Sequence, residues 1–349
     1  MKVLVLFGGR SGEHEVSVIS ARLVVDALTE LGHEAICVGI TRDGRWVKQR
    51  PDEADRVEES KEAFVLAPMP HANPGIDVVF PVLHGPNGED GSLQGLFELA
   101  DIPYVGAGVE GSAIGINKIT HKKLFAQAGL PVVDFVSFTR DEWPDPTLVD
   151  AIEKLGYPSF SKPARLGSSV GISKIHDVGE IDAAVERALR HDDDVIIEAQ
   201  GYAREIEVGV LGDPPEVSVV GEVVPDGEFY DYRAKYLGDW TELRIPADVP
   251  PAVERAVHEL AVRAFRISRA EGFARVDFFF DPATDALQVN EINTVPGMTP
   301  NSMFPLLWET SGKPFPEVVR ALLIHALARH EGKTNLEAAR AAAHDDEVS

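Results

Sequence analysis

The run KVLVLFGG at residues 2–9 restricts the fold more than any other part of this sequence. Its apolar residues do not alternate with polar ones, so a strand here needs apolar cover on both faces. Interior strands of parallel sheets have this pattern, because crossover helices cover both sides of such a sheet. A helical pattern follows from Val16 to about Leu31, and EAICVGI and IDVVFPVLHG are typical of further strands. We predict that the chain begins with a parallel α/β domain.

The pattern changes after residue 106, where short strands and helices no longer alternate regularly. The predicted helices there lie at 110–128, 147–155, 251–270, 302–310 and 316–330. Strand-like runs lie between these helices, and the part after residue 200 is rich in them. A chain of 349 residues is long enough for two or three domains. The predicted domains are 1–106, 107–198 and 199–330, followed by a flexible alanine-rich tail at 331–349.

The charge balance excludes some classes of partner. The chain has 57 Asp and Glu against 33 Lys and Arg, a formal net charge of −24. Nucleic-acid and anionic-membrane surfaces need clustered Lys and Arg, so we expect neither partner. The single cysteine, Cys37, cannot form an internal disulfide, and no apolar run is long enough for a signal peptide or a membrane span. These features predict a cytoplasmic protein.

Three oxygen-bearing side chains interrupt two apolar runs in ARVDFFFDPATDALQVNEINTVPGMTP, residues 274–300. Glu291 and Asn293 share one face of a strand because side chains alternate. Asp277 joins them if the two runs pair as a hairpin through the turn-forming DPATDA. Two carboxylates and an amide oxygen suit Mg²⁺ or Mn²⁺ better than zinc. The alternative is a solvated acidic edge.

A divalent cation of this kind needs phosphate partners, and two standard phosphate motifs fit poorly. GKT at 332–334 lacks the upstream glycine of a P-loop, since Leu327 stands there. GAGVEG at 106–111 matches the G-x-G-x-x-G pattern, but no convincing βαβ unit surrounds it. A nicotinamide oxidoreductase that uses this motif is therefore the weaker hypothesis.

SKPARLGSSVGIS, residues 161–173, is the better candidate for binding phosphate. Backbone N–H groups and hydroxyls of such a glycine-rich loop can surround phosphate oxygens. Lys118, Lys162 and Lys235 supply cations in an otherwise acidic chain. Together with the acidic hairpin, these features favour nucleotide binding.

Seven motifs now occur in the order found in one family. They are GGRSGEHEVS, LHGPNGEDGSLQG, INKITHK, SKPARLGSSVGIS, FYDYRAKY, ARVDFFF and NEINTVPGMTPNSMFP. The chain resembles the D-alanine–D-alanine ligases of the ATP-grasp superfamily from Val3 to about residue 330. The resemblance implies a three-domain α/β ATP-grasp fold, in which an N-terminal parallel α/β domain precedes two antiparallel-sheet α+β domains that clamp ATP.

The same resemblance implies a reaction and its cofactors. Such ligases use ATP to phosphorylate the carboxylate of one D-alanine, and the amine of a second D-alanine then displaces phosphate to give D-alanyl-D-alanine for peptidoglycan precursors. Two Mg²⁺ or Mn²⁺ ions would bind Asp277, Glu291 and Asn293. The implied nucleotide-binding residues are Lys118, Lys162, Ser169, Glu198, Glu205 and Lys235.

Further roles follow from the resemblance, residue by residue. The implied catalytic residues are Glu13, Ser168, Tyr236, Arg275 and Gly297. Arg275 and the backbone N–H of Gly297 would form the oxyanion hole. The implied substrate contacts are His84 near the first D-alanine and Ser302 and Met303 near the carboxylate of the second. Taken without the resemblance, Arg275 could equally form only a structural ion pair with Asp277.

Several alternatives stay open at this point. Ligases that make D-alanyl-D-lactate typically lack the loop tyrosine, whereas Tyr236 is present, which favours an amine as the second nucleophile. A D-alanine–D-serine ligase, a D-alanine–D-lactate ligase, another ATP-grasp carboxylate–amine ligase and a non-catalytic nucleotide-binding module are the other hypotheses. Family members are commonly homodimers, so a homodimer is expected.

Overall fold

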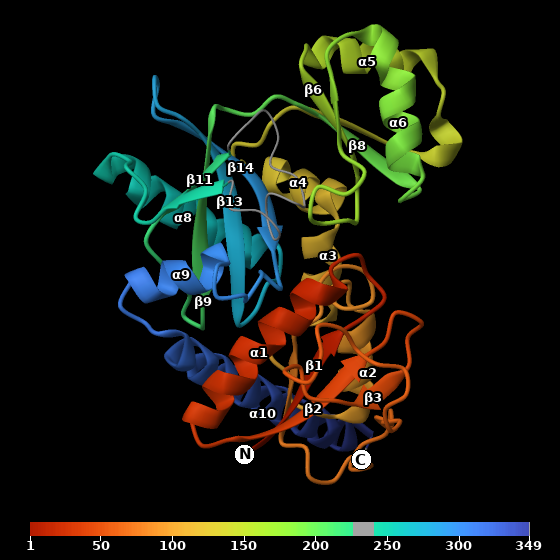
Figure 1. Cartoon of the computed structure of the whole chain (residues 1–349), viewed down its shortest axis with the longest axis vertical. Coiled ribbons are helices and arrows are strands. Elements are labelled where there is room, and N and C mark those ends of the chain that lie inside the picture. Colours follow the sequence, from red (N-terminus) through yellow and green to blue (C-terminus); the bar gives the residue numbers. More distant parts are fainter. Residues whose placement is uncertain (226–240, 349) are drawn as a thin grey trace.

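The computed structural model describes residues 1–225 and 241–348 and contains three sheets (Figure 1). The first sheet lies at one end of the molecule, near the N-terminus, and the other two lie at the opposite end (Figure 1). No helix in the described part of the chain is both long and apolar enough to cross a lipid bilayer.

The first sheet has the predicted parallel core. Its order is β3 (Trp46–Lys48), β2 (Glu34–Ile40), β1 (Lys2–Gly8), β4 (Val78–Pro81). Strand β1 runs parallel to both β2 and β4, and only β3 is antiparallel. Every side chain from Val3 to Phe7 is fully buried, as the unbroken apolar run predicts. Helices α1 (His14–Glu30) and α2 (Ser92–Ala100) cover this sheet.

The predicted helix at 110–128 is wrong, because the structure has two helices there. They are α3 (Val109–Ile116) and α4 (Lys118–Gln127). Asn117 between them has an extended backbone (φ −91°, ψ 101°), and its side chain accepts hydrogen bonds from the N–H groups of Ile119 and Thr120. Asn117 is thus an N-cap that restarts the helix in a new direction.

The second sheet is small and wholly antiparallel. Its order is β5 (Phe135–Thr139), β8 (Asp194–Ala199), β6 (Ser159–Pro163), β7 (Ser173–Ile175). Its helices are α5 (Pro146–Leu155) and α6 (Ile181–Leu189), with short 3₁₀ turns η1 (Arg140–Glu142) and η2 (Val178–Glu180). The apolar faces of both α-helices pack on one face of this sheet around Phe138, Val185 and Ile197. Its other face is left for the large sheet and the site.

The third sheet is the largest. Its order is β12 (Thr241–Arg244), β11 (Gly221–Pro225), β9 (Arg204–Leu211), β13 (Phe273–Asp281), β14 (Ala286–Asn293), with β10 (Glu216–Val217) paired to β9. Helix α8 (Pro251–Ile267) packs on one face, where alternate residues of β13 are buried. Helix α9 (Met303–Thr310) packs near β9 and β11. The predicted helix at 251–270 ends slightly early, at Ile267.

Helix α10 (Phe315–Val348) is longer than predicted and joins the first domain. Its residues Phe315, Val318 and Leu322 pack in one hydrophobic cluster with Val3 and Val5 of β1. The segment after Glu331, predicted to be a flexible tail, continues as helix to Val348. The division into domains stays a prediction, but the last helix packs with the N-terminal sheet although sequence order placed it in the third domain (Figure 1).

Candidate active site

The acidic hairpin forms as predicted, with one irregularity. Strands β13 and β14 are antiparallel neighbours, and Asp277 lies directly opposite Glu291. The next pair is Phe278 with Val289, so Asn290 is an extra residue on β14. One additional residue of this kind is a β-bulge.

This bulge determines to which face of the sheet each side chain of β14 points. Val289 and Ile292 are three positions apart, and both are buried in the apolar cluster beneath α8. In a strand with strict alternation, residues three apart would point to opposite faces. Because Asn290 is inserted, Glu291 and Asn293 can face the small sheet while Val289 and Ile292 both stay in the core.

Arg275 organises the acidic side chains on the site face. Its Nε and Nη2 lie 2.7 Å from the two carboxylate oxygens of Asp277, and Nε lies 2.9 Å from Oε2 of Glu207 on β9. The Asn293 amide donates to Asp277 at 3.0 Å. The structural ion pair considered from sequence therefore exists. Glu207, opposite Asp277 on β9, is a buried site residue that our sequence reasoning missed.

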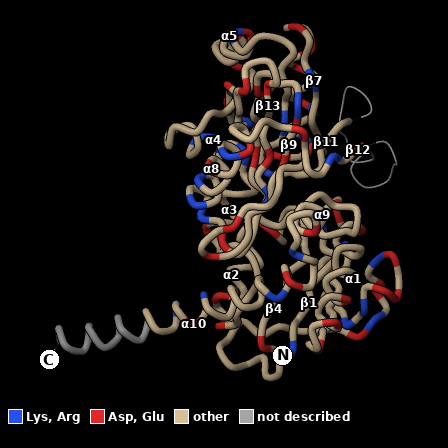
Figure 2. The backbone as a smooth tube through the Cα atoms, turned by 90° about the vertical axis from the view of Figure 1, so that its left-hand side faces the viewer, with Lys and Arg blue, Asp and Glu red and all other residues tan. Residues whose placement is uncertain are grey.

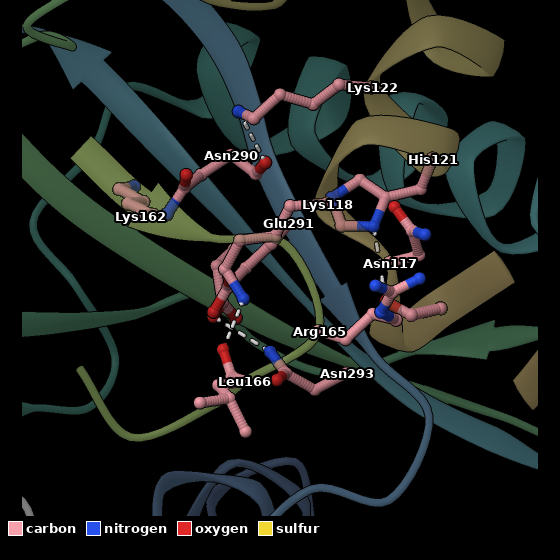
Figure 3. A network of polar contacts seen from close by, with 12 residues as sticks. Asn117, Lys118, His121, Lys122, Lys162, Arg165, Leu166, Asn290, Glu291 and Asn293 are labelled. Atoms are coloured by element: carbon pink, nitrogen blue, oxygen red, sulfur yellow. Dashed lines mark hydrogen bonds and ion pairs between the residues drawn. The ribbon is translucent and has the colours of Figure 1, made fainter. Parts of the chain in front are cut away.

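Two lysines on one face of α4 reach β14 (Figure 3). The Lys118 Nζ donates to the Leu166 carbonyl at 2.7 Å and lies 3.7 Å from Glu291. One turn later, the Lys122 Nζ donates to the Asn290 carbonyl at 2.9 Å. Lys118 is thereby placed between the glycine loop and the acidic hairpin, as a phosphate-binding lysine requires.

Glu198 on β8 bridges two lysines. Its carboxylate lies 2.7 Å from the Lys162 Nζ and 3.0 Å from the Lys122 Nζ. Burial opposes ionisation of Glu198, but the two ammonium groups outweigh it and lower its pKa to about 2. Glu198, one of the implied nucleotide-binding residues, is thus engaged with lysines in this structure. Around β9 and β13, acidic and basic segments lie next to one another (Figure 2).

Three cavities meet at this point. The largest, about 330 Å³, lies between the two antiparallel sheets, with Phe160 and Phe279 among its walls. A second of about 80 Å³ lies toward the first domain, and a third of about 20 Å³ lies between Glu89 and Lys118. Gly167 and Glu291 line all three cavities. A long ligand in the largest cavity could therefore present its end to the second.

Asp277 lines none of the three cavities, and the other predicted residues that the structure describes divide between the two larger ones. Those lining the largest are Lys118, Lys162, Ser168, Ser169, Glu198, Glu205 and Glu291. Those lining the second are Glu13, His84, Ser168, Arg275, Glu291, Asn293, Gly297, Ser302 and Met303. Lys235 and Tyr236 lie outside the described residues, so their predicted roles stay predictions.

The glycine loop contacts the first domain. The Ser168 hydroxyl donates a hydrogen bond to the carboxylate of Glu13, immediately before α1. Ser168 and Ser169 have φ of 52° and 59°, a left-handed conformation that is uncommon for residues other than glycine. The backbone turn therefore directs the Ser168 side chain at Glu13. Glu13 and Ser168, two of the residues that the resemblance implies to be catalytic, are thus in contact.

Two titratable groups line the second cavity beside Glu13. His84 is buried with Nδ1 3.0 Å from the Val295 carbonyl, and its Nε2 has no hydrogen-bond partner among the described residues. Burial lowers the pKa of His84, which favours the neutral form of the ring. Burial, followed by the nearby Glu13 carboxylate, raises the pKa of Glu89 to about 8. Glu89 lies in the LHGPNGEDG motif but was not singled out from sequence.

The start of α9 closes the second cavity. Ser302 is the N-cap, and its Oγ accepts from the Thr299 N–H at 3.0 Å. The Met303 side chain is buried in an apolar cluster with Val223 and Leu307, so only its backbone can contact a substrate. Helix N-termini favour anions because their first N–H groups lack intrahelical partners. A carboxylate can bind here.

The residues present fit a divalent cation that also binds phosphate. The described residues contain no group of three or more His, Cys, Asp and Glu side chains placed for a metal. Asp277, Glu291 and Asn293 instead offer two carboxylates and an amide oxygen from paired strands. Mg²⁺ typically takes one or two protein carboxylates and completes its shell with water and phosphate oxygens. The set suits Mg²⁺ or Mn²⁺ in complex with a nucleotide.

The GAGVEG motif has a structural role. The Gly108 N–H at the start of α3 donates to Glu271 at 3.1 Å, in the place a phosphate would take. A Cβ on Gly111 would lie 2.1 Å from the Arg269 carbonyl oxygen, so only glycine fits. The motif packs α3 against the turn before β13 and does not form a dinucleotide site.

Comparisons with known proteins agree with this geometry. Family models described as "D-ala D-ala ligase N-terminus" and "D-ala D-ala ligase C-terminus" match residues 2–107 and 124–324. The D-alanine–D-alanine ligases of Geobacillus kaustophilus and Solibacter usitatus are 46% and 45% identical to the chain. These alignments cover 96% and 95% of this chain, respectively, and 97% of each relative.

Solved structures give the same result for the fold. The D-alanine–D-alanine ligase of Coxiella burnetii superposes with a TM-score of 0.87 at 31% identity, covering 99% of both chains. The VanG D-Ala:D-Ser ligase of Enterococcus faecalis gives 0.83 at 36% identity, covering 93% of this chain and 99% of that one. The predicted ATP-grasp fold is confirmed. The chain belongs to the D-alanine–D-alanine ligase family.

Proposed function

We propose that the protein joins two D-alanine molecules to D-alanyl-D-alanine at the expense of ATP, with ADP and phosphate as the other products. The observation that carries this proposal is the meeting of the nucleotide-sized and substrate-sized cavities at Glu291 and Gly167. An ATP molecule between the sheets would extend its γ-phosphate toward that point. A carboxylate bound beside Arg275 would meet it there.

The first step requires charge to be spread over the transferring phosphoryl group. Lys118 and Lys162 would contact phosphate oxygens, and Ser169 of the glycine loop lines the same cavity as these lysines. When bound at Asp277, Glu291 and Asn293, Mg²⁺ or Mn²⁺ would neutralise phosphate charge as well. The Lys162 ammonium has to exchange part of its contact with Glu198 for the nucleotide.

Glu13 would bind the ammonium of the first D-alanine, and His84 would contact the same substrate. Ser168 links Glu13 to the glycine loop, so occupation of the loop by phosphates and closure over the substrate are coupled. Closure of this kind protects an acyl phosphate from water. Arg275 and the Gly297 N–H would stabilise the oxyanion as the second D-alanine attacks. The N-terminus of α9 at Ser302 would hold its carboxylate.

D-serine is the one competing second substrate that a specific observation favours. The VanG D-Ala:D-Ser ligase resembles this chain at 36% identity. The relatives named as D-alanine–D-alanine ligases are more similar to this chain, at 43–46% identity. We therefore favour D-alanine in both positions.

Mass detection of the product from ATP, Mg²⁺ and an equimolar mixture of D-alanine, D-serine and D-lactate tests this assignment. We expect D-alanyl-D-alanine as the main product and no product from L-alanine. An excess of D-alanyl-D-serine or D-alanyl-D-lactate would identify the protein as a D-alanine–D-serine or D-alanine–D-lactate ligase. Equal ADP release with D-alanine and L-alanine would identify another ATP-grasp ligase. A homodimer and a cytoplasmic location remain part of the proposal.

A further inference from the structure

Lys122 is a buried cation that has no assigned role in the proposed reaction. Its side chain is 1% exposed, and it comes from α4, between the two antiparallel sheets. Nζ lies 3.0 Å from Oε1 of Glu198 in the small sheet and 2.9 Å from the Asn290 carbonyl in the large sheet. Lys122 lines neither the cavity of about 330 Å³ between the antiparallel sheets nor the cavity of about 80 Å³ toward the first domain. Its position calls for another explanation.

The Asn290 carbonyl belongs to the β-bulge on β14. The extra residue of a bulge lies outside the regular ladder, so its polar groups need other partners. Lys122 supplies that partner from a helix that Asn117 caps at its N-terminus. The ammonium is a strong donor because it is charged, and Glu198 balances this charge.

The spacing on α4 links this contact to the acidic hairpin. Lys118 and Lys122 are four residues apart and therefore share one face of the helix. Lys118 lies 3.7 Å from Glu291, whereas Lys122 binds the backbone of the preceding residue, Asn290 (Figure 3). The helix thus contacts two consecutive residues of β14 at the point where the strand changes its alternation.

We propose that Lys122 is a positioning residue that fixes the β-bulge at Asn290 and thereby directs Glu291 and Asn293 toward the metal-binding face. Without this anchor, the bulge can migrate along β14. If the side chains of β14 then alternated regularly from Val289 onward, Glu291 would point into the apolar core and Ile292 into the site. The inference rests on the proposed function of Glu291 and Asn293 as metal ligands.

The test uses the full-length protein and Mn²⁺ as the probe. Lys122→Met removes the ammonium at similar length, Lys122→Arg keeps a charged donor, and Lys123→Met alters the exposed neighbour on the same helix as the matched control. Mn²⁺ binding is measured by electron paramagnetic resonance with saturating ADP, which excludes turnover. ADP affinity without metal is measured by calorimetry.

We expect the Mn²⁺ dissociation constant to rise about 10–100-fold in Lys122→Met, as for loss of other outer-shell contacts. A smaller rise is expected in Lys122→Arg and none in Lys123→Met, while metal-free ADP affinity changes less than Mn²⁺ affinity in every variant. Unchanged Mn²⁺ affinity in a folded Lys122→Met protein would overturn the proposal, even if its melting temperature fell.

Two further outcomes are decisive. If Lys122→Met does not fold, Lys122→Leu, which also lacks an N–H donor, takes its place with the same readouts and the same criteria. If the wild-type protein with ADP binds no Mn²⁺, the metal assignment itself fails, and the positioning role fails with it. Wild-type Mn²⁺ binding with no change in the Lys122 variants would reject the positioning role alone.

Discussion

Ser168 donates a hydrogen bond to Glu13 across 155 positions of the chain. The donor lies on the glycine loop between β6 and β7, and the acceptor precedes α1 of the first domain. Each residue also lines the substrate cavity. The contact therefore joins the loop that would cover the phosphates to the residue that would bind the first D-alanine.

Removing this contact should slow the reaction by weakening closure. A hydrogen bond to a charged group contributes about 1.5–3 kcal/mol, so we expect Ser168→Ala to lower kcat/KM for D-alanine about 10–100-fold. The matched control is Ser173→Ala, because the buried Ser173 hydroxyl has no hydrogen-bond partner among the described residues. Equal rates for the two variants in a phosphate-release assay would contradict a role for the loop contact.

The paired acids Asp277 and Glu291 should determine the metal dependence. Glu291→Gln keeps the shape of the side chain but removes a charge, and we expect D-alanine-dependent phosphate release to fall at least about 100-fold, the upper end of outer-shell effects. Asp285→Asn, in the turn of the same hairpin at φ 58°, is the control, since Asn tolerates that conformation. Activity of Glu291→Gln near the wild-type level at saturating Mg²⁺ would refute the ligand assignment.

Arg275 should also stabilise the fold. Its replacement leaves the buried Asp277 and Glu207 carboxylates without this cation, and loss of one partner from a buried ion pair costs about 3–5 kcal/mol. We expect Arg275→Met to lower the free energy of unfolding in urea by this amount. The double variant Arg275→Met/Glu207→Met should lose less than the single variant. A loss below about 1 kcal/mol in Arg275→Met would argue against the pairing.

Glu89 should make stability fall as pH rises. Its folded pKa, about 8, lies above the ordinary value of 4.5 because of burial and the nearby Glu13 carboxylate. The protonated group therefore contributes stability that is fully present below about pH 4.5 and is lost as pH rises through about 8. Between pH 5 and 9 without substrate, the free energy of unfolding should decline more in the wild type than in Glu89→Gln. Parallel pH profiles would contradict this, and Glu110→Gln, at an exposed position in the first turn of α3, serves as the control.

Sequence reasoning predicted the structure correctly where a local pattern of residues has a single physical explanation. The unbroken apolar run in β1 required cover on both faces, and the structure provides it. The pairing of Asp277 with Glu291 followed from alternation and a turn-forming link. Both inferences depend only on local patterns.

Most of what sequence reasoning missed depends on contacts between distant segments, although the break in the helix at Asn117 is local. The helical pattern at 110–128 continues through Asn117, and only its capping hydrogen bonds show that the helix restarts. Lys122 and Glu207 looked like ordinary charged residues, because their partners lie in other elements. The four-residue spacing of Lys118 and Lys122 was the one available signal for the second lysine. The bulge at Asn290 leaves no mark beyond the three-residue spacing of Val289 and Ile292.

The packing of α10 against β1 constrains how the chain can be made. Phe315, Val318 and Leu322 complete a core whose other side is formed by Val3 and Val5 of β1, so this core needs segments that are synthesised far apart in time. The apolar surface of β1 stays incomplete until α10 has emerged from the ribosome, and exposed apolar surface promotes aggregation. The parallel domain is therefore completed only after Phe315 and the residues that follow it have been synthesised, and a chain cut short before Phe315 keeps apolar surface of this domain exposed.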